Sequence, residues 1–381
     1  MDPMFVKPRT RSLLEHFGAI KDARQPCKVM YPLPGVLLLV VCATIAGCDD
    51  YDEIAAWGKE RLDFLRRFLP YHWGVPCEDW LRVVMNRIDP ALFSACFTAW
   101  AGGLRSNAPD LIAIDGKTSR RSHDRGRGRQ ALHLVSAWAS SERLVLGQEA
   151  VADKSSETEA IPALLERLAL TGALVTIDAI ACNPTIAAAI VDAGGDYLLA
   201  VKDNQPSLKA EIESYFADAP ATEVETLTLT DKDHGRVETR RHLVSTKVDW
   251  MTSNRRYPGA PRFKALAAIA MVEATVARQG QTTTARRYYI SSTPLSARRC
   301  AQAVRAHWGI ENRLHWVLDV IFKEDQSRLR TGHGAKNMAV IRHFAINLVR
   351  LGKGRRSIKT ARKVAGWNPD YLATLIATLP R

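Results

Sequence analysis

Two acidic residues of this 381-residue chain occupy an unusual position, because each ends a short apolar run. Asp115 ends the run LIAID, and Asp178 ends the run LVTID. Acidic residues are depleted inside strands, whereas α/β sheets carry their functional groups at strand ends. On adjacent strands the two carboxylates would lie close together, which is costly unless a cation shares them. A hard ion such as Mg²⁺ fits such a site; the alternative is that each Asp caps a turn.

A third acid, Glu311, lies in the segment RAHWGIENRLHWVLDVIFKED, which has the apolar periodicity of a helix. His307 and His315 lie four residues before and after it, so the three side chains are predicted to share one helix face. This pattern is not typical of a solvated face, although a surface salt-bridge helix stays the alternative. Zinc is disfavoured, because no further His or Cys pairs converge on the two histidines. The same segment contains three rival acids: Asp319, Glu324 and Asp325.

Three carboxylates suit chemistry on a phosphodiester. The substrate is already negative and repels an attacking oxygen. Two divalent ions about 4 Å apart can hold the attacking and leaving oxygens in line and absorb the developing charge. The carboxylates hold the ions and do not need a raised pKa, so no side chain is assigned as a general base. This interpretation predicts two Mg²⁺ or Mn²⁺ ions bound by Asp115, Asp178 and Glu311.

The charge balance favours a polyanionic partner. The chain has 53 Lys and Arg residues against 40 acidic residues, a net charge of +13, and an excess of this size favours nucleic acid. None of its seven Cys residues form a CxxC pair, which disfavours a disulfide framework and indicates a reducing compartment. The longest apolar run, Val36–Ile45, is far shorter than the roughly 20 residues that span a bilayer. We therefore expect a buried helix there and no membrane role.

The chain divides into five segments by pattern. Residues 1–105 show helical periodicity, and residues 106–221 show short apolar runs in the order β-β-β-α-β-α-β. Residues 222–293 form a β-rich block. Residues 294–351 are helical and contain Glu311, and residues 352–381 form a basic tail with a short helix. The predicted fold class is α/β, with a mixed sheet and helices on its faces. The strands predicted first in this sheet are Leu111–Asp115, Leu132–Ala139, Arg143–Val151, Leu174–Asp178 and Tyr197–Val201.

Several longer motifs are together highly specific. They are LLEHFGAIKDARQ, IAIDGKTSRRS, LHLVSAWAS, VTIDAIACN, GGDYLLAVKDNQP, HGRVETR, HWGIENRLHWVLDVIFKEDQSR and GHGAKNMAVIRHFAINL. Over nearly its full length the chain resembles insertion-sequence transposases of the DDE type, in the H-repeat-associated branch linked to Rhs elements. The resemblance implies a ribonuclease-H-like catalytic core with a β-rich insertion before the last catalytic acid. It also implies that Asp115, Asp178 and Glu311 are the catalytic acids.

The surroundings of the Glu depart from the wider transposase group. That group often has a Tyr seven residues before its Glu, an Arg four before and a Lys seven after. The equivalent residues here are Val304, His307 and Leu318. The departure leaves open how DNA ends are contacted near the Glu, and whether a hairpin intermediate forms.

Basic residues near the acids are candidates for DNA contacts. Residues 120–129, RRSHDRGRGR, would connect the first two strands close to Asp115. They could form a phosphate-binding loop, and the alternative is a flexible solvated loop. Residues 353–363 are a second basic stretch without acids. The DNA-binding residues predicted are Lys117, Arg120, Arg121, Arg125, Arg127, Arg129, His307, Arg328 and Arg330.

These observations predict a transposase that binds element ends, cleaves DNA with the help of metal ions and joins the 3′-OH to target DNA. The resemblance implies a homodimer when two ends are synapsed. It also implies a bacterial cytoplasmic protein that associates with the nucleoid when bound to DNA. Two alternatives are a metal-dependent nuclease without strand transfer and a non-catalytic DNA-binding protein derived from a transposase.

Overall fold

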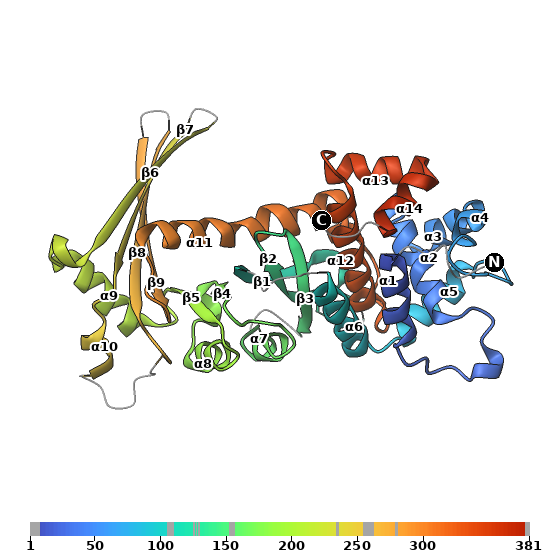
Figure 1. The fold of residues 1–381 in the computed structure, drawn as a ribbon, viewed down its shortest axis with the longest axis horizontal. Helices are drawn as coiled ribbons and strands as arrows, with labels where there is room; N and C mark the ends of the chain where they lie inside the picture. Colours follow the sequence, from blue (N-terminus) through green and yellow to red (C-terminus); the bar gives the residue numbers. More distant parts are fainter. Residues whose placement is uncertain are drawn as a thin grey trace.

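The computed structural model describes residues 8–104, 110–124, 126, 128, 130–151, 157–233, 236–253, 263–278 and 281–377. A bundle of helices forms one end of an elongated molecule, a sheet covered by helices forms the centre, and long β-hairpins form the other end (Figure 1). The acids identified in the sequence belong to the central part.

The helical end combines the first and the last helices of the chain. In the N-terminal part, the side chains of Asp50 and Asp89 accept hydrogen bonds from backbone N–H groups in the first turns of their helices, which explains where these helices begin. The N-terminal helices are α1 (Pro8–Gly18), α2 (Leu33–Ala46), α3 (Tyr51–Glu60), α4 (Leu62–Leu65), α5 (Glu78–Arg87) and α6 (Pro90–Gly103).

Helix α2 is apolar on every side and is buried on every side, as such a composition requires. It begins behind Pro32 and ends at Gly47, whose φ of 113° is in the left-handed region that favours glycine. Within the described part of the chain, no single helix is long and apolar enough to cross a membrane. Helices α2 and α3 reach that length and composition only as a pair, bent by 98°.

The C-terminal helices of the chain complete the helical end. Helices α12 (Gly334–Gly352), α13 (Ile358–Trp367) and α14 (Pro369–Ala377) pack against α2. Arg362, in the basic stretch 353–363, is buried: it donates a hydrogen bond to the Thr44 carbonyl at 2.8 Å and also contacts the Ile321 carbonyl. This arginine therefore joins helices and is not part of a basic surface.

A sheet of nine strands, counted in the described residues, runs through the centre and the β-hairpin end in the order β3-β2-β1-β4-β5-β9-β8-β7-β6. Strands β1, β4 and β5 are parallel, and all the other neighbours are antiparallel. This confirms the predicted α/β class. The strands are β1 (Leu111–Ser119), β2 (Leu132–Ala139), β3 (Leu144–Val151), β4 (Leu174–Ile177), β5 (Asp196–Val201), β6 (Glu225–Asp233), β7 (Arg236–Ser245), β8 (Ala268–Arg278) and β9 (Gln281–Ser291).

The β-rich block continues the central sheet. Strand β9 pairs with β5, from Leu198 opposite Ser291 to Val201 opposite Tyr288, and β8, β7 and β6 follow outward. Helices α9 (Pro206–Asp218) and α10 (Asp249–Ser253) lie beside these strands (Figure 1). Because one sheet runs through both parts, the block is joined to the core by backbone hydrogen bonds as well as by its chain connections.

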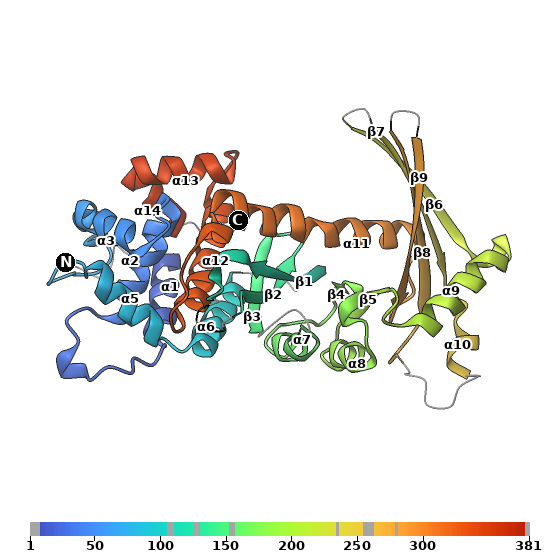
Figure 2. The same cartoon turned by 180° about the vertical axis from the view of Figure 1, so that it is seen from behind.

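Helices cover both faces of the central strands. Helices α7 (Glu157–Leu165) and α8 (Pro184–Asp192) lie on one face, and α11 (Ala297–Ile310) lies on the other (Figures 1 and 2). Ile114 and Ile177 belong to the core on the α7–α8 side. Leu174 and Leu198 belong to the core that contains Val304 of α11. Side chains alternate between the two faces of the sheet along a strand. The residues next to Ile114 and Ile177 in sequence therefore face α11.

Candidate active site

Asp115 and Asp178 lie side by side on the face covered by α11. Ile114 of β1 is opposite Ile177 of β4, and Asp115 and Asp178 are the next residues of the same parallel pair. Neighbouring strands are about 4.8 Å apart. Because Ile114 and Ile177 point toward α7 and α8, Asp115 and Asp178 point toward α11. The prediction that the two acids belong to adjacent strands is confirmed, but Asp115 does not end its strand, because β1 continues to Ser119 in its pairing with β2.

Helix α11 and its continuation bring the third acid to this face. Glu311 and His315 form one contact, with 3.3 Å between Oε2 and Nδ1, and the same Nδ1 lies 3.7 Å from Asp115 Oδ2. One turn earlier, His307 Nδ1 lies 3.0 Å from the Thr176 hydroxyl on β4. His307, Glu311 and His315 therefore share one helix face, as predicted. The helix becomes π-helical over Glu311–His315, a distortion common at functional sites.

A cavity of about 110 Å³ is lined by all three predicted acids. Its wall also contains Lys202 and His307. On one side of it, ligand atoms of Asp115, Glu311 and His315 all lie within 4.8 Å of one another. Two carboxylates and an imidazole are donors that divalent metal ions accept. The residues present therefore fit a divalent cation.

The three acids differ in pKa because their surroundings differ. Burial raises the pKa of Asp115; His315 opposes this effect and the Glu311 carboxylate adds to it. A hydrogen bond with His315 lowers the pKa of Glu311, against the effect of burial. Burial also acts on Asp178, but hydrogen bonds from the Ala179 N–H and from Lys202 lower its pKa. A divalent cation would favour the charged form of each acid, and Asp115 has the most to gain.

Lys202 was not among the residues predicted for the site. Its Nζ lies 3.0 and 3.2 Å from the two carboxylate oxygens of Asp178, and both side chains are about half exposed. Lys202 directly follows strand β5, just as Asp178 directly follows β4. The argument that identified the acids from strand ends would therefore also have identified Lys202, in the motif YLLAVKDNQP.

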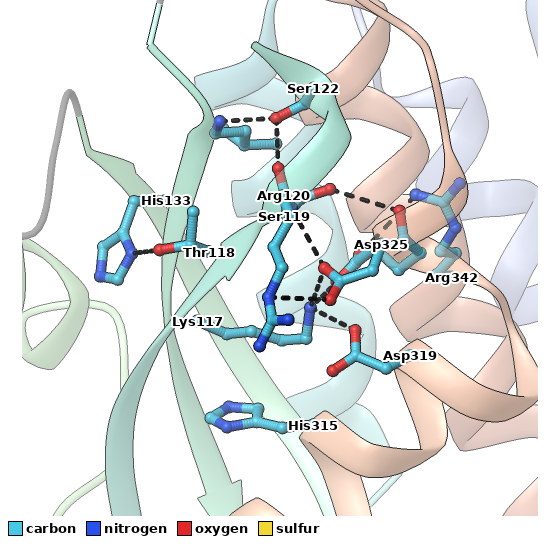
Figure 3. Close-up of polar contacts among 12 residues, drawn as sticks. Lys117, Thr118, Ser119, Arg120, Ser122, His133, His315, Asp319, Asp325 and Arg342 are labelled. Atoms are coloured by element: carbon cyan, nitrogen blue, oxygen red, sulfur yellow. Dashed lines mark hydrogen bonds and ion pairs between the residues drawn. The ribbon is translucent and has the colours of Figure 1, made fainter.

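The three rival acids converge on Lys117 (Figure 3). Lys117 Nζ lies 2.7 Å from Asp319, 2.9 Å from Glu324 and 3.5 Å from Asp325. Lys117 is only 8% exposed, because it follows Asp115 by two residues and points to the same covered face. Its ammonium thus faces carboxylates and is not presented to a phosphate. Glu311 is the acid of this region that lines the cavity with Asp115.

Of the other predicted DNA-binding residues, His307 lies on α11 beside Thr176, and the rest are spread over the loop after β1 and the segment after the Glu311 helix. Arg120 is 83% exposed and forms an ion pair of 3.3 Å with Asp325. Arg121 is exposed, and its carbonyl accepts a hydrogen bond of 3.2 Å from Arg330 Nε, so the two segments meet. Arg328 is also exposed. Three predicted residues lie outside the described part of the chain: Arg125, Arg127 and Arg129.

Two family models and several related proteins match this chain over most of its length. The sequence model of the family described as "Transposase DDE domain" matches residues 106–348, and that of the associated domain matches residues 14–101. The Escherichia coli (strain K12) protein YbfL is 37% identical over 372 residues, covering 96% of this chain and 98% of the relative. YhhI of the same strain, named as a candidate H repeat-associated transposase, has the same identity and coverage.

A solved structure of a piggyBac transposase synaptic complex with hairpin DNA is 10% identical, with a TM-score of 0.42; the match covers 98% of this chain and 79% of that one. The family match covers more than half of the chain, and the chain therefore belongs to the DDE transposase family. It is a transposase, an enzyme of the polynucleotidyl transferase class.

Proposed function

We propose that this transposase cleaves DNA at the ends of an insertion element and joins the freed 3′-OH to target DNA, with Asp115, Asp178 and Glu311 as its catalytic acids. One observation carries the assignment. Residues separated by 178 − 115 = 63 and 311 − 178 = 133 positions line a single cavity, on one face of one sheet. A structural role as turn caps would not require three acids so far apart in sequence to converge.

The metals proposed are two Mg²⁺ or Mn²⁺ ions held by the three acids. When bound, such ions neutralise charge at a phosphodiester and align the attacking and leaving oxygens. Asp115 lies between the other two acids. Asp178 directly follows the adjacent strand β4, and Glu311 belongs to the helix that covers this face of the sheet. It is therefore the residue suited to contact both ions. The contact of His307 with Thr176 holds the helix of Glu311 against β4.

In this proposal Lys202 has two roles: it neutralises Asp178 in the free protein and binds a substrate phosphate when metal ions are present. Its ammonium group neutralises Asp178 in the protein alone. A divalent ion on Asp178 would repel that ammonium, and a Lys side chain is long enough to turn to a substrate phosphate at the same cavity. Lys202 is thus proposed to exchange a carboxylate partner for a phosphate partner.

The fold proposed for the catalytic part is ribonuclease-H-like. Its support is the strand order β3-β2-β1-β4-β5, with an antiparallel meander followed by two parallel strands. The acids lie on the first strand, after the fourth strand and on the following long helix. In this assignment residues 106–221 and 294–351 form the core, residues 222–293 are an insertion into it, and residues 1–105 and 352–381 flank it.

The proposed substrates are element ends and target DNA, bound by a homodimer when two ends are synapsed. The net charge of +13 supports a polyanionic substrate. Arg120, Arg121, Arg328 and Arg330 are the basic side chains proposed to contact it beside the acids. Arg120, Arg121 and Arg328 are exposed, and Arg330 lies where the two segments meet. Both properties support that role.

The test uses purified protein, DNA carrying the sequences that flank the gene on both sides, a target plasmid and Mn²⁺. Products joined to the plasmid are expected. Cleavage without joining would instead identify a nuclease, and binding without cleavage would identify a non-catalytic derivative. The variants Asp115→Asn, Asp178→Asn and Glu311→Gln are expected to lower cleavage by about 10³-fold, which corresponds to about 4 kcal/mol of transition-state stabilisation, while DNA binding is retained.

A matched control tests the choice of the third acid. Asp325→Asn removes a carboxylate of the same helical region that faces Lys117 and lies outside the cavity. This variant is expected to keep cleavage within about 10-fold of the wild type, a loss of at most about 1.4 kcal/mol. Equal losses in Asp325→Asn and Glu311→Gln would contradict the assignment of Glu311.

A further inference from the structure

His315 directs a buried imidazole nitrogen at two of the catalytic acids. The residue is 5% exposed, so its ring is held by the protein and not by solvent. Its Nδ1 lies 3.3 Å from Glu311 Oε2 and 3.7 Å from Asp115 Oδ2. One of the three ligand atoms comes from β1 and the other two come from the helix. All three lie within 4.8 Å of one another.

The distances suit a shared cation as well as a direct hydrogen bond. Charge-assisted N–H···O bonds are about 2.7–2.9 Å long, and both contacts of His315 are longer. Ligand atoms around one metal ion at about 2.1 Å are about 3.0 Å apart in octahedral geometry and about 3.4 Å apart in tetrahedral geometry. The 3.3 Å and 3.7 Å separations are close to that spacing, and all three atoms lie within 4.8 Å of one another.

Two further features of His315 bear on its role, and the first is shared by ring nitrogens of His242 and His343. Its Nε2 is buried and has no hydrogen-bond partner among the described residues, whereas His133 is bonded on both ring nitrogens, to Thr118 and Glu157. The π-helical geometry also begins at Glu311, includes His315 and resumes over Val317–Ile321. The residues that converge on Asp115 therefore lie at the start of an irregular stretch, and such stretches are frequent at functional sites.

We propose that His315 is a nitrogen ligand of one of the two metal ions, in a mixed site with Asp115 and Glu311. The inference rests on the proposed function, because it takes Asp115 and Glu311 as metal ligands. It makes the two ions unequal: one is bound on the side of Asp178, and the other has an imidazole in its ligand set. Mg²⁺ prefers oxygen ligands, whereas imidazole suits the later divalent metals. The mixed site is therefore expected to select Mn²⁺ or Co²⁺ over Mg²⁺.

The test is spectroscopic and needs no DNA. Wild-type protein is titrated with Mn²⁺ alone, and pulsed electron paramagnetic resonance records whether a nitrogen nucleus couples to the bound ion. An imidazole coupling is expected, and protein grown with ¹⁵N-histidine should change its frequency. The variant His315→Gln should lose the coupling and bind Mn²⁺ about 10- to 100-fold more weakly. Its affinity for Mg²⁺ should fall less.

His307→Gln is the matched control, because His307 lies one turn before Glu311 and lines the same cavity. It should keep the imidazole coupling. A coupling that persists in His315→Gln, or that disappears only in His307→Gln, would overturn the proposal. If His315→Gln does not fold, the isotope experiment on the unaltered sequence still shows whether a histidine binds the ion, and a coupling that is lost in His307→Gln would then overturn the proposal.

Failure of the inference and failure of the proposed function give different results. Bound Mn²⁺ without nitrogen coupling, weakened by Asp115→Asn and Glu311→Gln, overturns the role of His315 and leaves the carboxylate assignment intact. Bound Mn²⁺ that is unaffected by Asp115→Asn and Glu311→Gln contradicts the catalytic assignment itself, and with it the mixed site.

Discussion

Lys117 Nζ lies 2.9 Å from Glu324 Oε2, and this ion pair ties the strand of Asp115 to the segment that follows the helix of Glu311. Glu324 is 1% exposed and also lies 3.7 Å from Arg342 of α12. The strand and the helix that carry two of the proposed catalytic acids are therefore joined through a buried charge cluster. The cluster around Lys117 (Figure 3) therefore restrains β1 relative to the segment that follows the helix of Glu311.

Lys117→Met should destabilise the protein strongly. It leaves the buried Glu324 with one cation fewer, and removing one partner of a buried pair costs about 3–5 kcal/mol. Urea unfolding measures this loss. Arg67→Met is the matched control, because the Arg67–Asp370 pair is on the surface, and such a pair contributes at most about 1 kcal/mol. Equal losses in the two variants would show that the Lys117 cluster is not a stabilising element.

The same cluster predicts how stability depends on pH. Burial acts to raise the pKa of Glu324, but Lys117 and Arg342 outweigh it, and the pKa lies below its ordinary value of 4.5. A carboxyl whose pKa is lower in the folded state stabilises the protein above its ordinary pKa, and this contribution is lost as the pH falls through the folded value. The unfolding free energy of wild type should therefore decline on acidification below about pH 4.5.

The comparison with Glu324→Gln isolates this residue from other acids. The variant has no carboxyl to titrate at that position, although Lys117, Arg342 and His343 still surround it. Its unfolding free energy should be lower than that of wild type near neutral pH, and the difference should shrink as the pH falls. A difference that stays constant with pH would show that the pKa of Glu324 is not lowered by folding.

How far the sequence alone could predict this site depends on the range of the interactions involved. Asp115 and Asp178 were identified because each ends an apolar run, which is a local signal, although the strand of Asp115 itself continues to Ser119; adjacent strands then bring the two acids together. The helix face of His307, Glu311 and His315 follows from spacing alone. By contrast, spacing could not separate Glu311 from its rivals.

The rivals were distinguished by a contact that no local pattern encodes. Lys117 and Glu324 are 207 residues apart, and only the packing of β1 against the segment after the helix brings them together. The same limit applies to the β-rich block. Its strands were predictable from composition, but the pairing of β9 with β5 is non-local. The packing of Arg362 beneath α2 is likewise determined by tertiary structure.

Lys202→Met should have opposite effects on metal binding and on cleavage. Without its ammonium group, Asp178 is more available to a cation, so Mn²⁺ should bind up to about 5-fold more tightly, in line with the worth of a half-exposed ion pair. Cleavage should nevertheless fall, because the proposed phosphate contact is lost. The measurements are Mn²⁺ titration and the cleavage rate at saturating Mn²⁺.

Lys209→Met is the control for Lys202→Met, since Lys209 pairs with the neighbouring Asp203 outside the cavity. It should leave both the Mn²⁺ affinity and the cleavage rate unchanged. If Lys202→Met weakened Mn²⁺ binding, the idea that its ammonium competes with the metal would be wrong.

Gly116→Ala should disturb the site from the opposite face of β1. Gly116 follows Asp115, and its N–H donates a hydrogen bond of 2.9 Å to the Asp115 carboxylate. An added Cβ would collide with Glu157 Oε1 and lie 2.6 Å from His133 Nε2. These two side chains are buried and bonded to each other at 2.6 Å, so they cannot simply move away. Such overpacking costs about 1–3 kcal/mol.

Gly309→Ala provides the matched comparison, because it lies in the helix of Glu311 and an added Cβ would meet no atom within 4 Å. Alanine in a helix is favoured over glycine by about 1 kcal/mol, so this variant should be more stable than wild type. Thermal unfolding should therefore shift in opposite directions for the two variants. Cleavage should fall in Gly116→Ala alone, since only that backbone supports Asp115. A Gly116→Ala variant with wild-type stability and cleavage would show that the His133–Glu157 pair does not restrain the strand of Asp115.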